Sequence, residues 1–122
     1  TMLLDSNIII YASQPRFANL REFIAETSPY VSAISYVEVL GYHRLTEDER
    51  TYFQAFFQAA SILPLSTDVV EQAVKLRQLR KMSLGDALVA GTALIHRLTL
   101  VTHNHKDFDW IPSLSISNPV DL

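Results

Sequence analysis

The sequence predicts an α/β protein, a three-layer α/β/α sandwich around a mainly parallel sheet. Short apolar runs rich in β-branched residues alternate with longer segments in which apolar residues recur at helical spacing. Two of the short runs, at residues 3–5 and 98–102, lead directly into polar side chains. Alternating strands and helices favour a parallel sheet that helices cover on both faces.

Five short strands are expected because their residues are apolar and often β-branched. They cover residues 3–5, 30–34, 62–65, 98–102 and 114–117. Pro64 indicates that the third strand lies at an edge or near a strand end, since proline cannot donate to the ladder of a sheet. The strands therefore alternate with helices along the whole chain.

Six helices are expected between these strands. They cover residues 7–13, 16–26, 35–42, 46–60, 69–81 and 86–97. Pro15 ends the first helix, the sequence from Thr46 to Glu49 is a capping box, and Thr67-Asp68 caps the fifth helix. We interpret an aromatic stripe on the fourth helix as core or subunit interface and not as a base-stacking surface. The stripe consists of Tyr52, Phe53, Phe56, Phe57 and Ala60.

Length and composition indicate one globular domain over residues 2–122. The chain has 122 residues, of which 48% are hydrophobic and 19% charged. Its formal net charge of −3 excludes a general nucleic-acid coat protein, so any contact with nucleic acid must be local or mediated by metal. The absence of cysteine excludes a disulfide scaffold and a thiolate metal site. No apolar run is long enough to cross a membrane, and we expect a cytoplasmic protein.

Four of the 13 Asp and Glu residues lie beside apolar segments at strand ends or in predicted first helical turns: Asp5, Glu38, Asp86 and Asp107. Asp5 follows the first strand and Asp107 follows the fourth. Glu38 and Asp86 each come three residues after a serine, Ser35 and Ser83 respectively. Helix starts and strand carboxyl ends share one edge of a parallel sheet, so the four carboxylates can converge.

Each acid also has a plainer interpretation. The two Ser-x-x-acid sequences are capping boxes or near relatives, and Asp5 could itself be a helix cap. The joint pattern favours a site, because carboxylates in one partly dry pocket repel and only Lys106 lies nearby to neutralise them. Either their pKa values rise or a cation sits among them. Oxygen ligands without cysteine select Mg²⁺ or Mn²⁺, which activates water for phosphoryl displacement.

Four motifs in order resemble a PIN-domain ribonuclease, and more closely the VapC type of toxin in type II toxin–antitoxin modules. They are Asp-Ser-Asn after the first strand, Ser-x-x-Glu, Gly-Asp-Ala-Leu-Val-Ala, and Leu-Val-Thr-x-Asn-x-x-Asp-Phe. The resemblance covers nearly the whole chain, from Leu3 to about Pro112. It implies that the acidic site around Mg²⁺ or Mn²⁺ consists of Asp5, Glu38, Asp86 and Asp107.

The resemblance also assigns supporting residues. Asn104 occupies a position that is often acidic in relatives, so either Asn104 or Asp107 supplies the fourth group of the site. Polar side chains that orient carboxylates or water would come from Ser6, Asn7 and Thr102. Gly85 is a departure, because many relatives have proline before the aspartate.

The family implies cleavage of RNA, inhibition by a cognate antitoxin protein, and a homodimer. A basic run before Asp86, together with Lys106 after the fourth strand, suggests contacts with RNA phosphates, although a solvated helix face is the favoured interpretation. The candidates are Arg77, Arg80, Lys81 and Lys106. We expect no histidine ligand, since hard ions prefer oxygen.

Other protein classes fit the sequence less well. A haloacid-dehalogenase-like phosphatase needs a second aspartate where this chain has Asn7, and a receiver domain needs a lysine with different neighbours from those of Lys106. Two alternatives stay open. One is a PIN-like fold kept as a partner-binding module with weak or no catalysis, and the other is a PIN-like nuclease directed at DNA.

Overall fold

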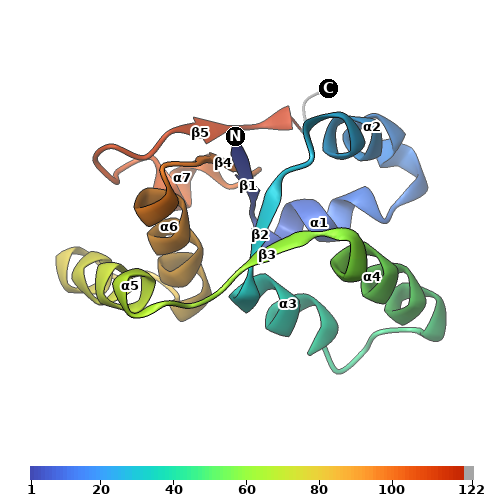
Figure 1. Cartoon of the computed structure of the whole chain (residues 1–122), viewed down its shortest axis with the longest axis horizontal. Coiled ribbons are helices and arrows are strands. Elements are labelled where there is room, and N and C mark those ends of the chain that lie inside the picture. The colour runs from blue at the N-terminus through green and yellow to red at the C-terminus, as the bar shows by residue number, and fades with distance from the viewer. Residues whose placement is uncertain (120–122) are drawn as a thin grey trace.

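The computed structural model describes residues 1–119 and contains one five-stranded sheet in the order β3-β2-β1-β4-β5 (Figure 1). Every neighbouring pair of strands is parallel. The strands are β1 (Met2–Leu4), β2 (Tyr30–Ser32), β3 (Ser61–Leu63), β4 (Thr99–Val101) and β5 (Ile116–Ser117). The predicted parallel sheet is therefore confirmed, including the fifth strand.

Helices cover both faces of this sheet, which confirms the α/β/α sandwich. In Figure 1, α5 and α6 lie on one side of the strands, and α1, α2 and α4 lie on the other. The helices are α1 (Ser6–Ala12), α2 (Ala18–Thr27), α3 (Ala33–Leu40), α4 (Glu47–Ala59), α5 (Thr67–Leu79), α6 (Leu84–His96) and α7 (His105–Phe108), with a 3₁₀ turn at Pro15–Phe17. Within residues 1–119, no helix combines the length and apolar character needed to cross a bilayer.

Successive residues of the central strands point to opposite faces of the sheet and build two separate cores. Leu4 and Val101 belong to the core that packs against α1, α2 and α4. Leu3 and Leu100 belong to the core formed with α5 and α6. All four side chains are fully buried, as expected for strands covered on both faces. Side chains of the two central strands thus pack against both helical layers.

The helix starts were only partly predicted. Thr46 and Glu49 form the predicted capping box of α4, and the edge position of β3 before Pro64 is confirmed. The predicted cap of α5 at Thr67 is wrong, because Ser66 accepts the hydrogen bond from Val69 N. Pro15 begins a 3₁₀ turn, in keeping with the preference of proline for first helical positions.

The start of α3 was also misplaced in the prediction. The helix begins at Ala33, capped by the Ser32 hydroxyl, which accepts from Ile34 N. Ser35 is therefore inside the helix, and Ser35 with Glu38 is not a capping box. Instead the two residues are three apart within the helix and share one face.

The aromatic stripe of α4 lies in the core, as predicted. Phe53 and Phe57 are buried there, and Tyr52, Phe56 and Ala60 pack around them. These rings meet at steep angles, as in the pair Phe56 and Phe57, whose centroids are 5.2 Å apart. A base-stacking role for the stripe is therefore not needed.

Candidate acidic active site

Asp5 lies where the order of the sheet reverses. The chain passes from β1 to β2 and β3 on one side, and adds β4 and β5 on the other. Asp5 follows β1, and its backbone N–H donates to Val101 O at 2.9 Å, at the end of β4. Such a reversal leaves a crevice at the carboxyl ends of the strands, where open α/β sheets bind ligands.

Asp5 is buried, with only 5% of its surface exposed, and both of its carboxylate oxygens accept hydrogen bonds. Ser6 N donates to Oδ1 and Thr102 Oγ1 donates to Oδ2, each at 2.8 Å. Burial raises the pKa of Asp5, and the charges of Glu38 and Asp107 raise it further, while these two hydrogen bonds lower it. Two hydrogen bonds therefore hold the carboxylate in place, while burial and the neighbouring acids disfavour its charged form.

Glu38 joins Asp5 through Ser6. The Ser6 hydroxyl lies 2.7 Å from Glu38 Oε1, to which it donates, and 2.8 Å from Ser35 Oγ. Ser6 and Ser35 are buried, whereas Glu38 is exposed, so its carboxylate reaches the cluster from the rim. A hydroxyl chain thus links the start of α1 to one face of α3.

Asp86 lies in the first turn of α6. Its backbone N–H donates to the Ser83 hydroxyl at 3.1 Å, as the Ser-x-x-Asp capping interpretation expects, so the helix begins at Leu84 and not at Asp86 as predicted. Its pKa is raised to about 6, first by burial and then by the charges of Asp5, Asp107 and Glu38. Every charged neighbour that shifts the pKa of Asp86 is a carboxylate. The four predicted acids therefore form one electrostatically coupled cluster.

Asp107 and Asn104 belong to a segment for which no helix was predicted. The structure has a short helix here, α7, with Asp107 exposed on it and Asn104 just before it. Asp107 acts on Asp5 and Asp86 through its charge. Asn104 connects to the site through its backbone N–H, which donates to Thr102 Oγ1 at 3.0 Å. Asn7 is exposed on α1.

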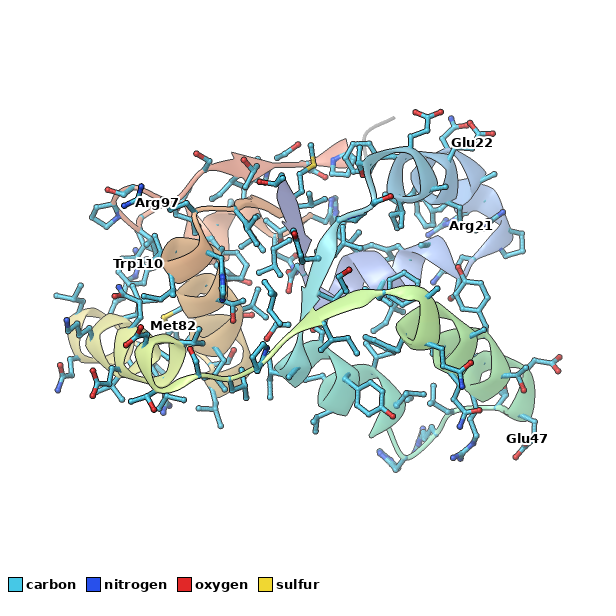
Figure 2. The ribbon with its side chains drawn as sticks, viewed as in Figure 1. Arg21, Glu22, Glu47, Met82, Arg97 and Trp110 are labelled. Atoms are coloured by element: carbon cyan, nitrogen blue, oxygen red, sulfur yellow. The ribbon has the colours of Figure 1, made fainter. Side chains whose placement is uncertain are left out.

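A cavity of about 150 Å³ opens beside Asp86 and Asp107, and cationic side chains line it. The Arg80 guanidinium lies 5.3 Å from the centroid of the Trp110 ring, and Trp110 Nε1 donates to Asp107 O at 3.0 Å. Figure 2 shows Trp110 in the same half of the molecule as Met82, far from Glu47. The cavity is lined by Arg80, Lys81, Met82, Ser83, Asp86, Lys106, Asp107 and Trp110.

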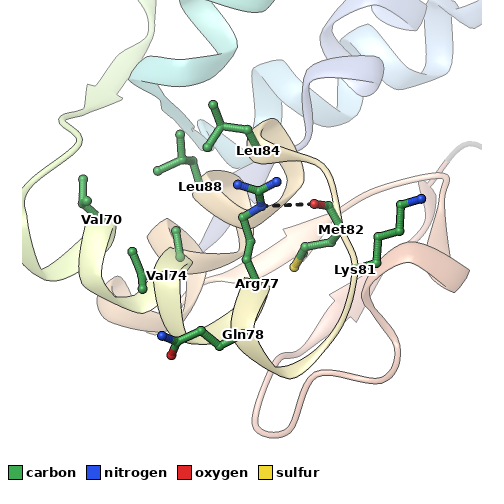
Figure 3. Close-up of a pocket in the computed structure, with 9 residues that line it drawn as sticks. Val70, Val74, Arg77, Gln78, Lys81, Met82, Leu84 and Leu88 are labelled. Carbon is green, nitrogen blue, oxygen red and sulfur yellow. Dashed lines mark hydrogen bonds between the residues drawn. The ribbon is translucent and has the colours of Figure 1, made fainter.

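Arg77 does not line this cavity. It lies in a neighbouring apolar groove of about 500 Å³ between α5 and α6 (Figure 3). Its Nε donates to Met82 O at 3.2 Å, which ties the end of α5 to the loop before α6. Lys81 and Met82 line both spaces. Of the four predicted basic residues, three therefore border the acidic cavity.

The donor set fits a hard divalent cation. Asp5, Glu38, Asp86 and Asp107 offer only oxygen, and their mutual repulsion is what a doubly charged ion would relieve. Each oxygen of Asp5 keeps a second acceptor position besides its hydrogen bond. Among residues 1–119, however, no three Asp, Glu or His side chains stand as a ready-made metal cage. Ligation therefore requires side-chain rotation, which the exposed Asp107 can make.

Three residues at the site were not predicted from the sequence. Ser35 was assigned to a cap, although its spacing of three residues from Glu38 already placed both on one helix face. Gly85 was noted only as a departure from the proline that many relatives have before the aspartate. Trp110 gave no local signal, since its place beside Arg80 depends on how the loop after α7 folds back.

A parallel α/β/α sandwich with acidic side chains at its switch point belongs to a small class of folds. Comparison of the sequence with known protein families identifies the member of that class. The profile of the PIN domain matches residues 2–113. The chain therefore belongs to the PIN domain family. No curated protein sequence matches it.

Solved structures confirm the resemblance to VapC-type toxins. A toxin–antitoxin complex from Klebsiella pneumoniae is 31% identical, with a TM-score of 0.78 and 98% of each chain covered. VapBC2 from Rickettsia felis, bound to a DNA fragment from its promoter, is 25% identical, with a TM-score of 0.79, 96% of this chain and 97% of that chain covered. VapBC-1 from nontypeable Haemophilus influenzae is 25% identical, with a TM-score of 0.78 and 96% of each chain covered.

Proposed function

We propose that this protein is a metal-dependent endoribonuclease and the toxin component of a type II toxin–antitoxin module. The observation that carries the proposal is the environment of Asp86, where burial first and then the charges of Asp5, Asp107 and Glu38 raise its pKa to about 6. Carboxylates that raise one another's pKa at the switch point of a parallel sheet are a functional-site signature. Membership of the PIN domain family supports a nuclease.

The residues have distinct roles in this proposal. Asp5, Glu38, Asp86 and Asp107 would hold Mg²⁺ or Mn²⁺. When bound, this ion supplies water activation and neutralises charge in an in-line displacement at phosphorus. Thr102 and Ser6 orient Asp5 through the two 2.8 Å hydrogen bonds. Ser6 also orients Glu38, and Ser83 fixes the start of α6 under Asp86.

RNA would be held next to the acids by the cations that border the cavity. Arg80, Lys81 and Lys106 line the same space as Asp86 and Asp107. Phosphates of a strand can pair with these cations while one phosphate faces the acids. Such an arrangement would let a chain whose net charge is −3 bind RNA locally.

An antitoxin protein is the proposed partner, and the protein is proposed to be a cytoplasmic homodimer. The Klebsiella pneumoniae structure is a toxin–antitoxin complex, and its match covers nearly all of this chain. A basic antitoxin segment would relieve the repulsion within the acidic cluster by the same physics as a cation. Inhibition would then follow from occupation of the cleavage site.

Cleavage of single-stranded RNA and DNA of the same sequence, offered side by side with Mn²⁺, tests the proposal. We expect RNA products that disappear with chelator and fall more than about 100-fold in Asp5→Asn, since losing a supporting partner alone costs about 10- to 100-fold. Asp109→Asn, an exposed acid on the same segment as Asp107, is the control. DNA cleavage alone would indicate the DNA-directed nuclease. The binding module would be indicated by two results together: no cleavage of either polymer, and growth arrest on expression of the protein that Asp86→Asn leaves unchanged.

A further inference from the structure

Gly85 lies directly against the carboxylate of Glu38, where α6 packs on α3. A β-carbon added to Gly85 would overlap Oε2 of Glu38 and approach its Cδ to 2.9 Å and Oε1 to 3.2 Å. Real β-carbons essentially never come closer than 3.0 Å to such atoms. In its present rotamer, the Glu38 carboxylate therefore occupies the space that a β-carbon at position 85 would fill.

This place is the one from which Glu38 takes part in the acidic cluster. Here Oε1 accepts the 2.7 Å hydrogen bond from Ser6 Oγ, and the charge of Glu38 acts on Asp5 and Asp86. We infer that Gly85 is a positioning residue, whose missing side chain gives the Glu38 carboxylate its place beside Asp86. The inference rests on the proposed function.

Backbone conformation does not explain the glycine. No glycine in residues 1–119 has a positive φ, and Gly85 lies in the first turn of α6, where alanine is the better helix former. Glycine therefore weakens the helix here, and no backbone conformation requires it. The space taken by the Glu38 carboxylate explains the glycine instead. Because the overlap involves the far end of a flexible side chain, Gly85→Ala is expected to fold and to swing Glu38 away.

Affinity for Mn²⁺, measured by quenching of Trp110 fluorescence, tests the inference. Trp110 is the single tryptophan of the chain and lines the cavity with Asp86. Gly85→Ala is expected to weaken Mn²⁺ binding about 10- to 100-fold, while the metal-free variant unfolds at the wild-type temperature or above it. Leu84→Ala is the control, because Leu84 is in the same turn but lines the neighbouring apolar groove.

A double-mutant cycle shows whether Gly85 acts through Glu38. In the Glu38→Ala background, Gly85→Ala is expected to cause no further loss of Mn²⁺ affinity. A full additional loss in that background would overturn the inference, and so would wild-type Mn²⁺ affinity in the Gly85→Ala single variant.

A crystal structure of metal-free Gly85→Ala separates this inference from the proposed function. We expect the Glu38 carboxylate to have left Ser6 Oγ, and this readout needs neither metal nor RNA. If the wild-type protein binds no Mn²⁺ and cleaves no RNA, the proposed function fails, yet the position of Glu38 still decides the inference. A Glu38 carboxylate that keeps its hydrogen bond to Ser6 in the Gly85→Ala variant would overturn it.

Discussion

The hydroxyl of Thr102 donates a 2.8 Å hydrogen bond to Oδ2 of Asp5, and so joins the ends of the two central strands β1 and β4. Both side chains are buried. The same hydroxyl accepts from Asn104 N, at the entry to the segment that carries Asp107. One threonine therefore holds the buried acid and begins the loop that brings a second acid to the site.

Thr102→Val is expected to destabilise the protein by about 1–3 kcal/mol, because it leaves Oδ2 of the buried Asp5 without its donor and the backbone N–H of Asn104 without its acceptor. Loss of this bond also raises the pKa of Asp5 further, since the bond favours the charged form. Urea unfolding at pH 7 measures the change, with Thr102→Ser as the control that keeps the hydroxyl. A valine variant as stable as the serine variant would contradict this role.

The acidic cluster should make the metal-free protein less stable as the pH rises. The pKa of Asp86 is raised from 3.8 to about 6, so between these values the folded state binds more protons than the unfolded state. The contribution of Asp86 to the free energy of unfolding then falls with increasing pH, by at most about 1.4 kcal/mol per pH unit for one proton. The raised pKa of Asp5 acts in the same direction.

Asp86→Asn is accordingly expected to be more stable than the wild type at pH 7, with the advantage shrinking as the pH falls from 6 to 4. Urea unfolding over this pH range measures the difference, and Asp109→Asn serves as the control for an exposed acid. An asparagine variant less stable than the wild type at pH 7 would contradict the predicted repulsion.

The cations around the cavity should determine how RNA binding depends on salt. In the Asp5→Asn background, which prevents cleavage, Arg80→Ala and Lys106→Ala are each expected to lower the slope of log affinity against log salt by about 0.7 per lost phosphate contact. Lys75→Ala is the matched control, because Lys75 is an exposed cation on α5 outside the cavity lining. Equal slopes for all three variants would show that Arg80 and Lys106 contact no phosphate, as expected of a solvated surface.

The fold could be predicted because its signals are local. Alternating segments gave the parallel sheet, and the apolar pairs Leu3–Leu4 and Leu100–Val101 contain the two-residue period that supplies both cores. The acids could be assigned to one edge because strand ends and helix starts coincide there in any parallel α/β unit. Their electrostatic coupling agrees with that expectation.

Other features depended on contacts between distant segments. Ser32 and Ser35 are both suitable caps for α3, and the choice between them follows from the pairing of Ser32 with Leu63 in the neighbouring strand. The space that Gly85 leaves for Glu38 exists only after α6 packs on α3. The approach of Arg80 to Trp110 likewise joins the end of α5 to the segment after α7, which local sequence patterns do not encode.

Titration of the metal-free protein with Mn²⁺, followed by Trp110 fluorescence, tests most directly whether the four carboxylates share one divalent ion. We expect saturable quenching in the wild type and at least about 10-fold weaker binding in each of Asp5→Asn and Asp86→Asn, whereas Asp109→Asn keeps the wild-type affinity. Binding of equal strength in all four proteins would show that no ion bridges Asp5 and Asp86, and would contradict the account.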